Sequence, residues 1–225
     1  MTAPQAIYAR RFAENQAYRA RVWHVLARRI FQPFVPDNGA ILDLGCGYGE
    51  LINNIRAGKR YAIDLNPDAR AKLAAGIEFL EQSSADPWPL PAESLDAVLT
   101  SNFFEHLPSK QALQETLAHA ARALRPGGVL VALGPNIRFL AGAYWDFVDH
   151  HVPLSDRSLA EALELAGLSV RRIVPRFLPY TMADAPGKSP RRAPAFLVEL
   201  YLRLPLAWPL FGKQFLIVAE KRASA

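Results

Sequence analysis

The sequence feature that most constrains the fold is an apolar run that ends in alternating glycines. Residues 41–50 read Ile-Leu-Asp-Leu-Gly-Cys-Gly-Tyr-Gly-Glu. The apolar part is typical of a short buried strand, and Gly45, Gly47 and Gly49 permit positive φ and leave no Cβ between the backbone and a ligand. The stretch therefore predicts a strand, a tight turn and a helix over residues 50–56.

The spacing of these glycines separates the turn from two better known ones. Dinucleotide folds use G-x-G-x-x-G and phosphate loops end in G-K-[ST], whereas this turn is G-x-G-x-G without a lysine, and Asp43 precedes its first glycine by two residues. The stretch resembles the nucleotide-binding motif of class I S-adenosylmethionine (SAM)-dependent methyltransferases, acid-x-Gly-x-Gly-x-Gly. The resemblance implies that Asp43 and the turn, with Cys46, face the methionine end of the cofactor.

Two later motifs extend the resemblance over residues 41–131. Residues 101–107 read S-N-F-F-E-H-L, which is similar to the family segment S-N-x-x-E-H-L after the fourth strand, and residues 124–130 fit the family marker L-R-P-G-G-x-L before the fifth strand. The resemblance implies that Ser101 and Asn102 approach the methionine moiety. It also implies a doubly wound, Rossmann-like α/β fold with seven strands in the order 3-2-1-4-5-7-6, mostly parallel, with the last strand antiparallel.

The hydrophobic pattern is that of strands alternating with helices, which favours an α/β sheet. The expected strands are residues 41–44, 61–64, 77–80, 94–100, 129–133, a strand beginning at 168–170, and 215–221. The expected helices are residues 5–31, 50–56, one starting at Pro67, 109–124, and 155–166.

Acidic residues after the second and third strands suit the rest of the cofactor. Asp64, followed by Leu65, lies 15 residues beyond Gly49, and an acid near this interval binds ribose hydroxyls in nucleotide-binding βαβ units. A solvent-facing strand end is the alternative. By resemblance, Asp86 matches the acid that bonds the adenine amino group. Trp88 is either the residue that packs on the ring or an ordinary core aromatic.

Residues 139–151 are dense in aromatic side chains and carry four ionisable groups within the last six positions. We expect this segment to bind a hydrophobic or sugar-like acceptor and to remove a proton from it, with His150 as the base, Asp146 beside it and His106 as the competing base. A structural role for His106 is the other interpretation. No metal is expected, because His150 and His151 diverge in both a strand and a helix.

The chain is interpreted as a single domain over residues 1–225, with a helical cap at 1–36 and an insert at 175–214. The insert has a basic cluster, Lys188, Arg191 and Arg192, followed by an apolar helical face interrupted by Pro205 (Phe196, Leu197, Leu200, Tyr201, Leu204 and Trp208). The face either packs on the sheet or a second subunit, or makes a peripheral contact with an anionic membrane surface.

Charge and cysteine content narrow the functional classes. Residues 170–225 hold ten Lys or Arg against three Asp or Glu, although the net charge of the whole chain is only +5. One cysteine excludes an intrachain disulfide and a Cys-based zinc site, and the N-terminus lacks the pattern of a secretory signal, so we expect a cytoplasmic protein.

The functional hypothesis is methyl transfer from SAM to a hydroxyl of a small molecule or glycan. Chains of this layout resemble methyltransferases of bacterial surface-polysaccharide pathways, which suggests a lipid-linked sugar. Methylation of a quinone or other lipid-like phenol and a non-catalytic SAM-binding role are alternatives. Nucleic acid is not expected as a partner, because S-N-F-F stands where amino-group methyltransferases carry N-P-P-[YF]. The sequence leaves the oligomeric state open.

Overall fold

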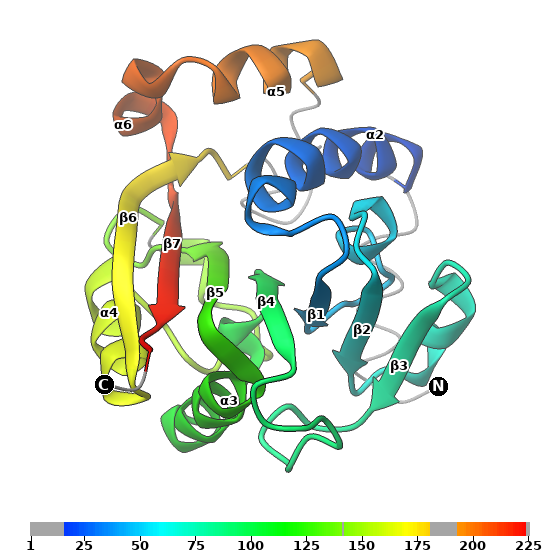
Figure 1. Ribbon diagram of the computed structural model, residues 1–225. Helices are drawn as coiled ribbons and strands as arrows, with labels where there is room; N and C mark the ends of the chain where they lie inside the picture. Colours follow the sequence, from blue (N-terminus) through cyan, green and yellow to red (C-terminus); the bar gives the residue numbers. More distant parts are fainter. Residues whose placement is uncertain (1–15, 141, 181–192, 224–225) are drawn as a thin grey trace.

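The computed structural model describes residues 16–140, 142–180 and 193–223. One sheet holds seven strands in the order β3-β2-β1-β4-β5-β7-β6, which confirms the predicted fold (Figure 1). Only β7 runs antiparallel to its neighbours β5 and β6. The strands are β1 (Ala40–Leu44), β2 (Lys59–Asp64), β3 (Ile77–Glu81), β4 (Leu95–Ser101), β5 (Leu124–Pro135), β6 (Leu168–Leu178) and β7 (Gln214–Lys221).

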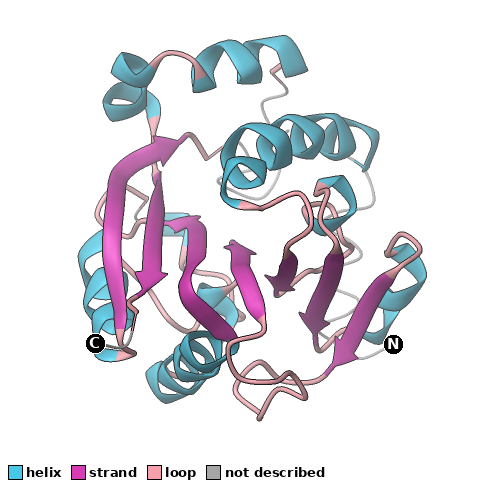
Figure 2. Cartoon of the chain, in the orientation of Figure 1, coloured by secondary structure: helices cyan, strands magenta, loops and turns pink. Residues whose placement is uncertain are grey.

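Helices cover both faces of this sheet (Figure 2). On one face, α3 (Lys110–Ala123) and α4 (Asp156–Leu165) pack through Leu117 and Leu163 on Leu42 of β1 and its neighbours. On the other, α2 (Gln16–Leu26) and the π-helix η2 (Ala27–Phe31) pack through Phe31 on Ile41. Because successive side chains of a strand alternate between faces, β1 contributes to both cores.

The helix predicted at residues 50–56 is wrong, since the structure has only a 3₁₀ turn, η4 (Ile52–Asn54). The Asn53 side chain donates to the Lys72 carbonyl at 2.9 Å and accepts from the Ala74 amide at 2.8 Å, and Asn54 bonds the Glu50 carbonyl at 2.9 Å. Asparagine side chains that bond the backbone in this way compete with helix formation. The helix expected from Pro67 is also a 3₁₀ helix, η5 (Pro67–Lys72), with Asn66 as its N-cap.

Two strands are longer than predicted. β5 begins at Leu124 and includes the Arg-Pro-Gly-Gly stretch, where its register with β4 shifts and Gly127 has φ 78°. β6 continues to Leu178, so residues 175–178 of the expected insert belong to the sheet. Pro175 is tolerated there because β6 is the edge strand, where a missing backbone donor costs no ladder bond.

The described part of the N-terminal helix, from Gln16, continues through η2 into the 3₁₀ turn η3 (Gln32–Phe34), while residues 5–15 lie outside the described residues. After β6 the chain forms α5 (Ala195–Leu202), η8 (Pro205–Ala207) and α6 (Trp208–Phe211). In Figure 1, α5 and α6 lie at the top of the molecule near α2. Within the described ranges, no helix is long and apolar enough to cross a membrane.

Candidate functional site

The glycine turn after β1 is shaped by positive φ angles at Gly45 (72°), Gly47 (53°) and Gly49 (79°). Its backbone is anchored to β2, because the amides of Gly45 and Cys46 donate to the Ile63 carbonyl at 2.9 and 3.0 Å. L side chains rarely adopt such angles, so glycine at all three positions allows the turn to close. Cys46 is a free, buried thiol, and burial raises its pKa.

Gly45 also leaves room for a neighbouring side chain. A Cβ at this position would lie 2.1 Å from the ring of Phe103, which follows β4. The missing side chain at Gly45 therefore serves the packing of the residue 101–104 segment on the turn, a use that the motif alone did not predict. This packing holds the end of β4 against the turn that follows β1.

Two acids stand at this turn. The Asp43 carboxylate is buried and accepts from the Ile52 amide at 3.2 Å, and burial raises its pKa to about 8. Asp64 accepts from the Gly47 amide at 2.7 Å and from the Asn66 amide at 2.8 Å, and burial raises its pKa as well. Buried carboxylates of this kind are stabilised by a cation, and the sulfonium and ammonium groups of SAM are cations, so the residues present fit this cofactor.

The predicted adenine-binding residues have different environments. Leu65 exposes 71% of its surface beside Asp64, and Asp86 is also exposed. Trp88, in contrast, is only 3% exposed, belongs to the core packed on α3, and donates its indole N–H to the Ser84 carbonyl at 2.9 Å. This burial favours the core interpretation of Trp88 and leaves Leu65 as the apolar side chain available to a ring.

Ser101 and Asn102 lie at the carboxyl end of β4. Asn102 has φ 49°, and its amide donates to the Leu133 carbonyl of β5 at 2.9 Å while its side chain donates to the Ser101 hydroxyl at 3.0 Å. Asparagine tolerates the left-handed region better than most residues, and such angles gather at functional sites. The turn therefore directs residues 103–106 over the sheet edge.

The next turn, η6 (Phe104–His106), is hydrogen-bonded to residues 144–152, which lie after β5. The Glu105 carbonyl accepts from the amides of His151 and Val152 at 2.8 and 3.1 Å. Its carboxylate is buried and accepts from the Tyr144 hydroxyl at 2.7 Å, and burial raises the pKa of both groups. Sequence reasoning did not assign Tyr144 a role, and no local signal pairs it with Glu105.

His106 and His150 come from different segments but meet in the structure, with ring centroids 4.8 Å apart. His106 Nδ1 lies 3.0 Å from the Asp149 carbonyl and 3.4 Å from its carboxylate. Burial disfavours the protonated ring, but the hydrogen bond to Asp149 and the charges of Glu105 and Asp149 outweigh it, so the pKa of His106 is raised. His150 Nδ1 lies 2.6 Å from the Tyr144 carbonyl.

Asp146 lies exposed, and the carboxylate that contacts a histidine here is that of Asp149. His151 is exposed as well. His106, Asp149 and His150 nevertheless offer ligand atoms within 4.8 Å of one another. Two histidines and a carboxylate are a donor set that divalent transition metals accept, and this combination requires tertiary structure to be found.

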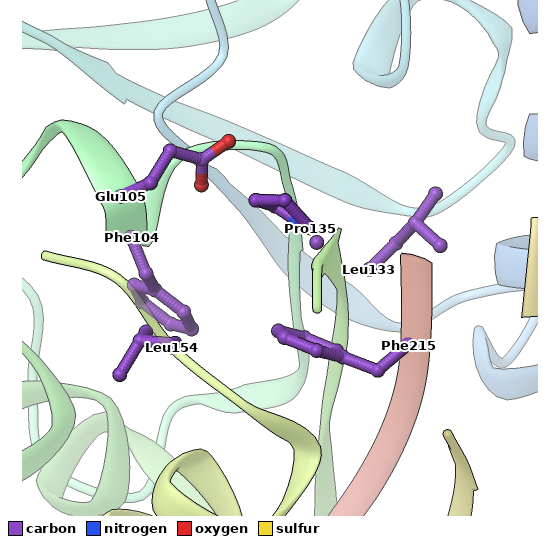
Figure 3. A pocket seen from close by; sticks show the side chains of 7 residues that line it. Phe104, Glu105, Leu133, Pro135, Leu154 and Phe215 are labelled. Carbon is purple, nitrogen blue, oxygen red and sulfur yellow. The ribbon is translucent and has the colours of Figure 1, made fainter. Parts of the chain in front are cut away.

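Aromatic rings surround the two histidines. The Tyr144 ring lies 4.2 Å from that of His150 and 5.0 Å from that of Tyr180, which follows β6. A small cavity lies beside this group, lined by Phe104, Glu105, Leu154 and Phe215 and by the end of β5 (Figure 3). The arrangement places aromatic faces next to two imidazole rings, which are groups that accept a proton.

Comparison with known proteins identifies the family. Residues 12–173 match the family model described as a methyltransferase domain, and because this match spans more than half of the chain, the chain belongs to that family. It is a SAM-dependent methyltransferase, with SAM as its cofactor. Among curated proteins no sequence matches significantly.

Solved structures share the fold at low identity. A chain of the Haloferax volcanii complex between the Trm112 methyltransferase activator and a methyltransferase has a TM-score of 0.66 and 20% identity, over 94% of this chain and 95% of that one. A SAM-dependent methyltransferase from Archaeoglobus fulgidus has a TM-score of 0.66 and 23% identity, over 93% and 99%. One from Mesorhizobium loti has 0.57 and 18%, over 84% and 94%.

Proposed function

We propose that this enzyme methylates a hydroxyl group of a small molecule or glycan. The more specific proposal is that the acceptor is a sugar carried on a lipid. The observation that carries the proposal is the cluster of His106, Asp149 and His150 within a ring of aromatic side chains at the sheet edge that also holds the glycine turn. A hydroxyl has a pKa far above neutrality, so its methylation gains from a base in a way that amine methylation does not.

In this proposal, different residues bind the methionine, ribose and adenine parts of the cofactor. Asp43, Gly45, Cys46, Gly47 and Gly49 form the surface toward the methionine end, with Ser101 and Asn102 facing it. The two oxygens of Asp64 suit the ribose hydroxyls, since backbone amides orient the carboxylate and leave it further capacity to accept hydrogen bonds. Leu65 and Asp86, both exposed, suit the adenine ring and its amino group.

In the proposed reaction SAM supplies an electrophilic methyl group on a sulfonium. The acceptor oxygen would form a bond to this carbon as the carbon–sulfur bond breaks and S-adenosylhomocysteine leaves, and a histidine would take the acceptor proton. His106 has the more complete support as the base, because the Asp149 carboxylate orients its ring and stabilises its protonated form. His150, the first choice from sequence, is held by a carbonyl instead and is the competing base.

A lipid-like phenol, such as a quinone precursor, is the second candidate acceptor. It is favoured by the aromatic side chains around His150 and by the exposed apolar helices that follow β6.

We also propose a cytoplasmic location, a contact of the 175–214 segment with the membrane surface, and no nucleic-acid partner. The single-domain organisation with a 1–36 cap belongs to the same proposal.

The test is a search for the methylated product. The protein is incubated with SAM carrying a trideuterated methyl group and with fractions of a native metabolite extract, and products are sought by mass spectrometry. A labelled product in a fraction of hydroxylated or lipid-linked glycans is expected, and label in a quinone fraction would select the second candidate. If SAM binds but no fraction gains label, the chain is a SAM-binding protein without this activity.

A further inference from the structure

The α5–α6 segment exposes large apolar side chains along its whole length. Exposed fractions range from 49% at Leu204 to 89% at Leu206 in a set that we call the apolar ridge: Phe196, Leu200, Leu204, Leu206, Leu210 and Phe211. Single exposed leucines are ordinary, but here six large exposed apolar side chains fall within 16 residues. Such a concentration of exposed apolar surface is typical of an interaction site.

The inner side of this segment is already packed. The Tyr201 hydroxyl donates to the Phe177 carbonyl at 2.6 Å, the Trp208 indole donates to the Tyr201 carbonyl at 3.1 Å, and the Trp208 and Phe177 rings lie 4.8 Å apart. The face predicted from sequence is therefore split: Tyr201 and Trp208 turn inward while Phe196, Leu197, Leu200 and Leu204 turn outward. A helix that is apolar on all sides is normally covered on all sides, and the outer side of α5 is not.

The helix α2, which packs beside α5, is basic. α2 and η2, from Gln16 to Phe31, contain four arginines and no acid, and of these Arg21, Arg28 and Arg29 are exposed. Residues 193–213 contain one acid, Glu199, which is paired with Arg29 and, at 2.8 Å, with Arg203. Exposed arginines beside an apolar strip complement a surface that is anionic outside and apolar within, namely a bilayer with acidic headgroups.

The ridge also lies near the acceptor site. β6 is parallel to β5, because both are antiparallel to β7, so their carboxyl ends share one edge of the sheet. α6 is tied to that end of β6 by the Arg176 side chain, which donates to the Leu210 and Gly212 carbonyls at 3.1 and 2.9 Å. At the same end, the Tyr180 ring contacts the ring of Tyr144, which in turn contacts His150.

We propose that the apolar ridge, with the exposed arginines of α2 and η2, docks on an anionic lipid bilayer and lies in its headgroup layer. Docking holds the sheet edge with His106 and His150 at the membrane surface, where a headgroup or lipid-linked sugar is within reach. The docking stands independently of the reaction, and only the access to a lipid-carried acceptor rests on the proposed function.

The experiment measures binding of the full chain to phosphatidylcholine vesicles with and without phosphatidylglycerol, by flotation at low and high salt. We expect binding only with phosphatidylglycerol, weakened by salt. Leu206→Glu with Leu210→Glu should reduce binding by at least about tenfold, because two charges replace two inserted leucines. Arg21→Gln with Arg28→Gln should lower binding about tenfold at low salt and remove most of its salt dependence.

The matched control is Leu165→Glu, a charge placed on a leucine that is 75% exposed before β6, at the other end of that strand from α6. It should bind vesicles like the wild type. Circular dichroism and SAM affinity should be unchanged in every variant, so loss of docking is separate from loss of cofactor binding. No wild-type binding to anionic vesicles, or equal loss in Leu165→Glu, overturns the proposal. Self-association that the ridge variants abolish, without vesicle binding, overturns it in favour of a second copy as the occupant.

Discussion

The glycine turn after β1 and the histidine cluster after β4 lie at the same edge of the sheet, but they are assembled differently. The turn is held by short links between neighbouring strands, as from Gly45 to Ile63. The cluster is held by contacts across the chain, such as Tyr144 to Glu105 and His106 to Asp149, 39 and 43 residues apart. In the function that we propose, the cofactor therefore binds to local backbone geometry, whereas the acceptor binds to side chains that tertiary packing brings together.

The largest expected effect lies in the histidine cluster. His106→Gln should lower turnover by about 10² to 10⁴ and leave SAM affinity unchanged, because a proton acceptor is lost but the cofactor residues are intact. Since the pKa of His106 is raised, wild-type turnover should rise with pH through a value above the usual 6.5 of histidine. Single-turnover assays between pH 5 and 9, a window about that value, would show both effects.

His150→Gln is the matched variant. Loss of turnover in His150→Gln with little change in His106→Gln would transfer the role of base to His150. A chelator should leave wild-type turnover unchanged. If it abolishes turnover and a divalent metal restores it, the His106, Asp149 and His150 group is a metal site and the base assignment is wrong.

Next in size is the ribose contact. Asp64→Ala should weaken SAM binding by about 1 to 3 kcal/mol, roughly 5- to 150-fold, because two buried hydroxyls lose their acceptor. Gly47→Val should weaken it as well, since valine is strained at φ 53° and its side chain enters the turn. Calorimetry with SAM and S-adenosylhomocysteine measures both, and wild-type affinity in both folded variants would remove the assignment of this turn to the cofactor.

Tyr144→Phe probes the link between the two parts of the acceptor site. The substitution leaves the buried Glu105 carboxylate without its 2.7 Å hydrogen bond. We expect a loss of about 1 to 2 kcal/mol in the free energy of unfolding, with SAM affinity retained. Urea denaturation checks this. Tyr180→Phe keeps the ring that contacts Tyr144 and serves as the control, and an equal loss there would mean that the Glu105 bond is not what stabilises the cluster.

The last prediction concerns the pH dependence of stability, which we expect from the buried acid on the cofactor side. Burial raises the pKa of Asp43 to about 8, above the usual 3.8 of an aspartate. Its contribution to stability is therefore fully present below about pH 4 and is lost as pH rises through about 8, by at most about 1.4 kcal/mol per unit. Asp64, Glu105 and His106 also have raised pKa values and act in the same direction.

The comparison with Asp43→Asn isolates the contribution of one carboxyl. Between pH 5 and pH 8, an interval that lies between the unfolded and folded pKa values of Asp43, the free energy of unfolding of the ligand-free wild type should fall. That of ligand-free Asp43→Asn should fall less. Urea unfolding at the two values measures it. Identical slopes in the two proteins would place the origin of the pH dependence elsewhere.

The sequence by itself determined the parts of this protein that depend on neighbours in the chain. The glycine turn, Asp64 at the end of β2 and the Ser155 N-cap of α4 follow from periodicity, from positive φ at glycine and from capping, which are local effects. The strand order was expected from the family resemblance, not from these local effects. The helix at 50–56 failed because Asn53 bonds Lys72 and Ala74, and such partners are invisible to a local pattern.

The tertiary structure alone decided which side chains face one another. Trp88 takes the core position that was one of its two possible roles, and the apolar face of the insert divides between packing and exposure. Asp149 contacts His106, whereas the sequence suggested Asp146 beside His150. In each case the sequence fixes the chemical type of the residue. Its partner is set by how the helices and loops pack on the sheet, because packing brings together residues that no spacing along the chain relates.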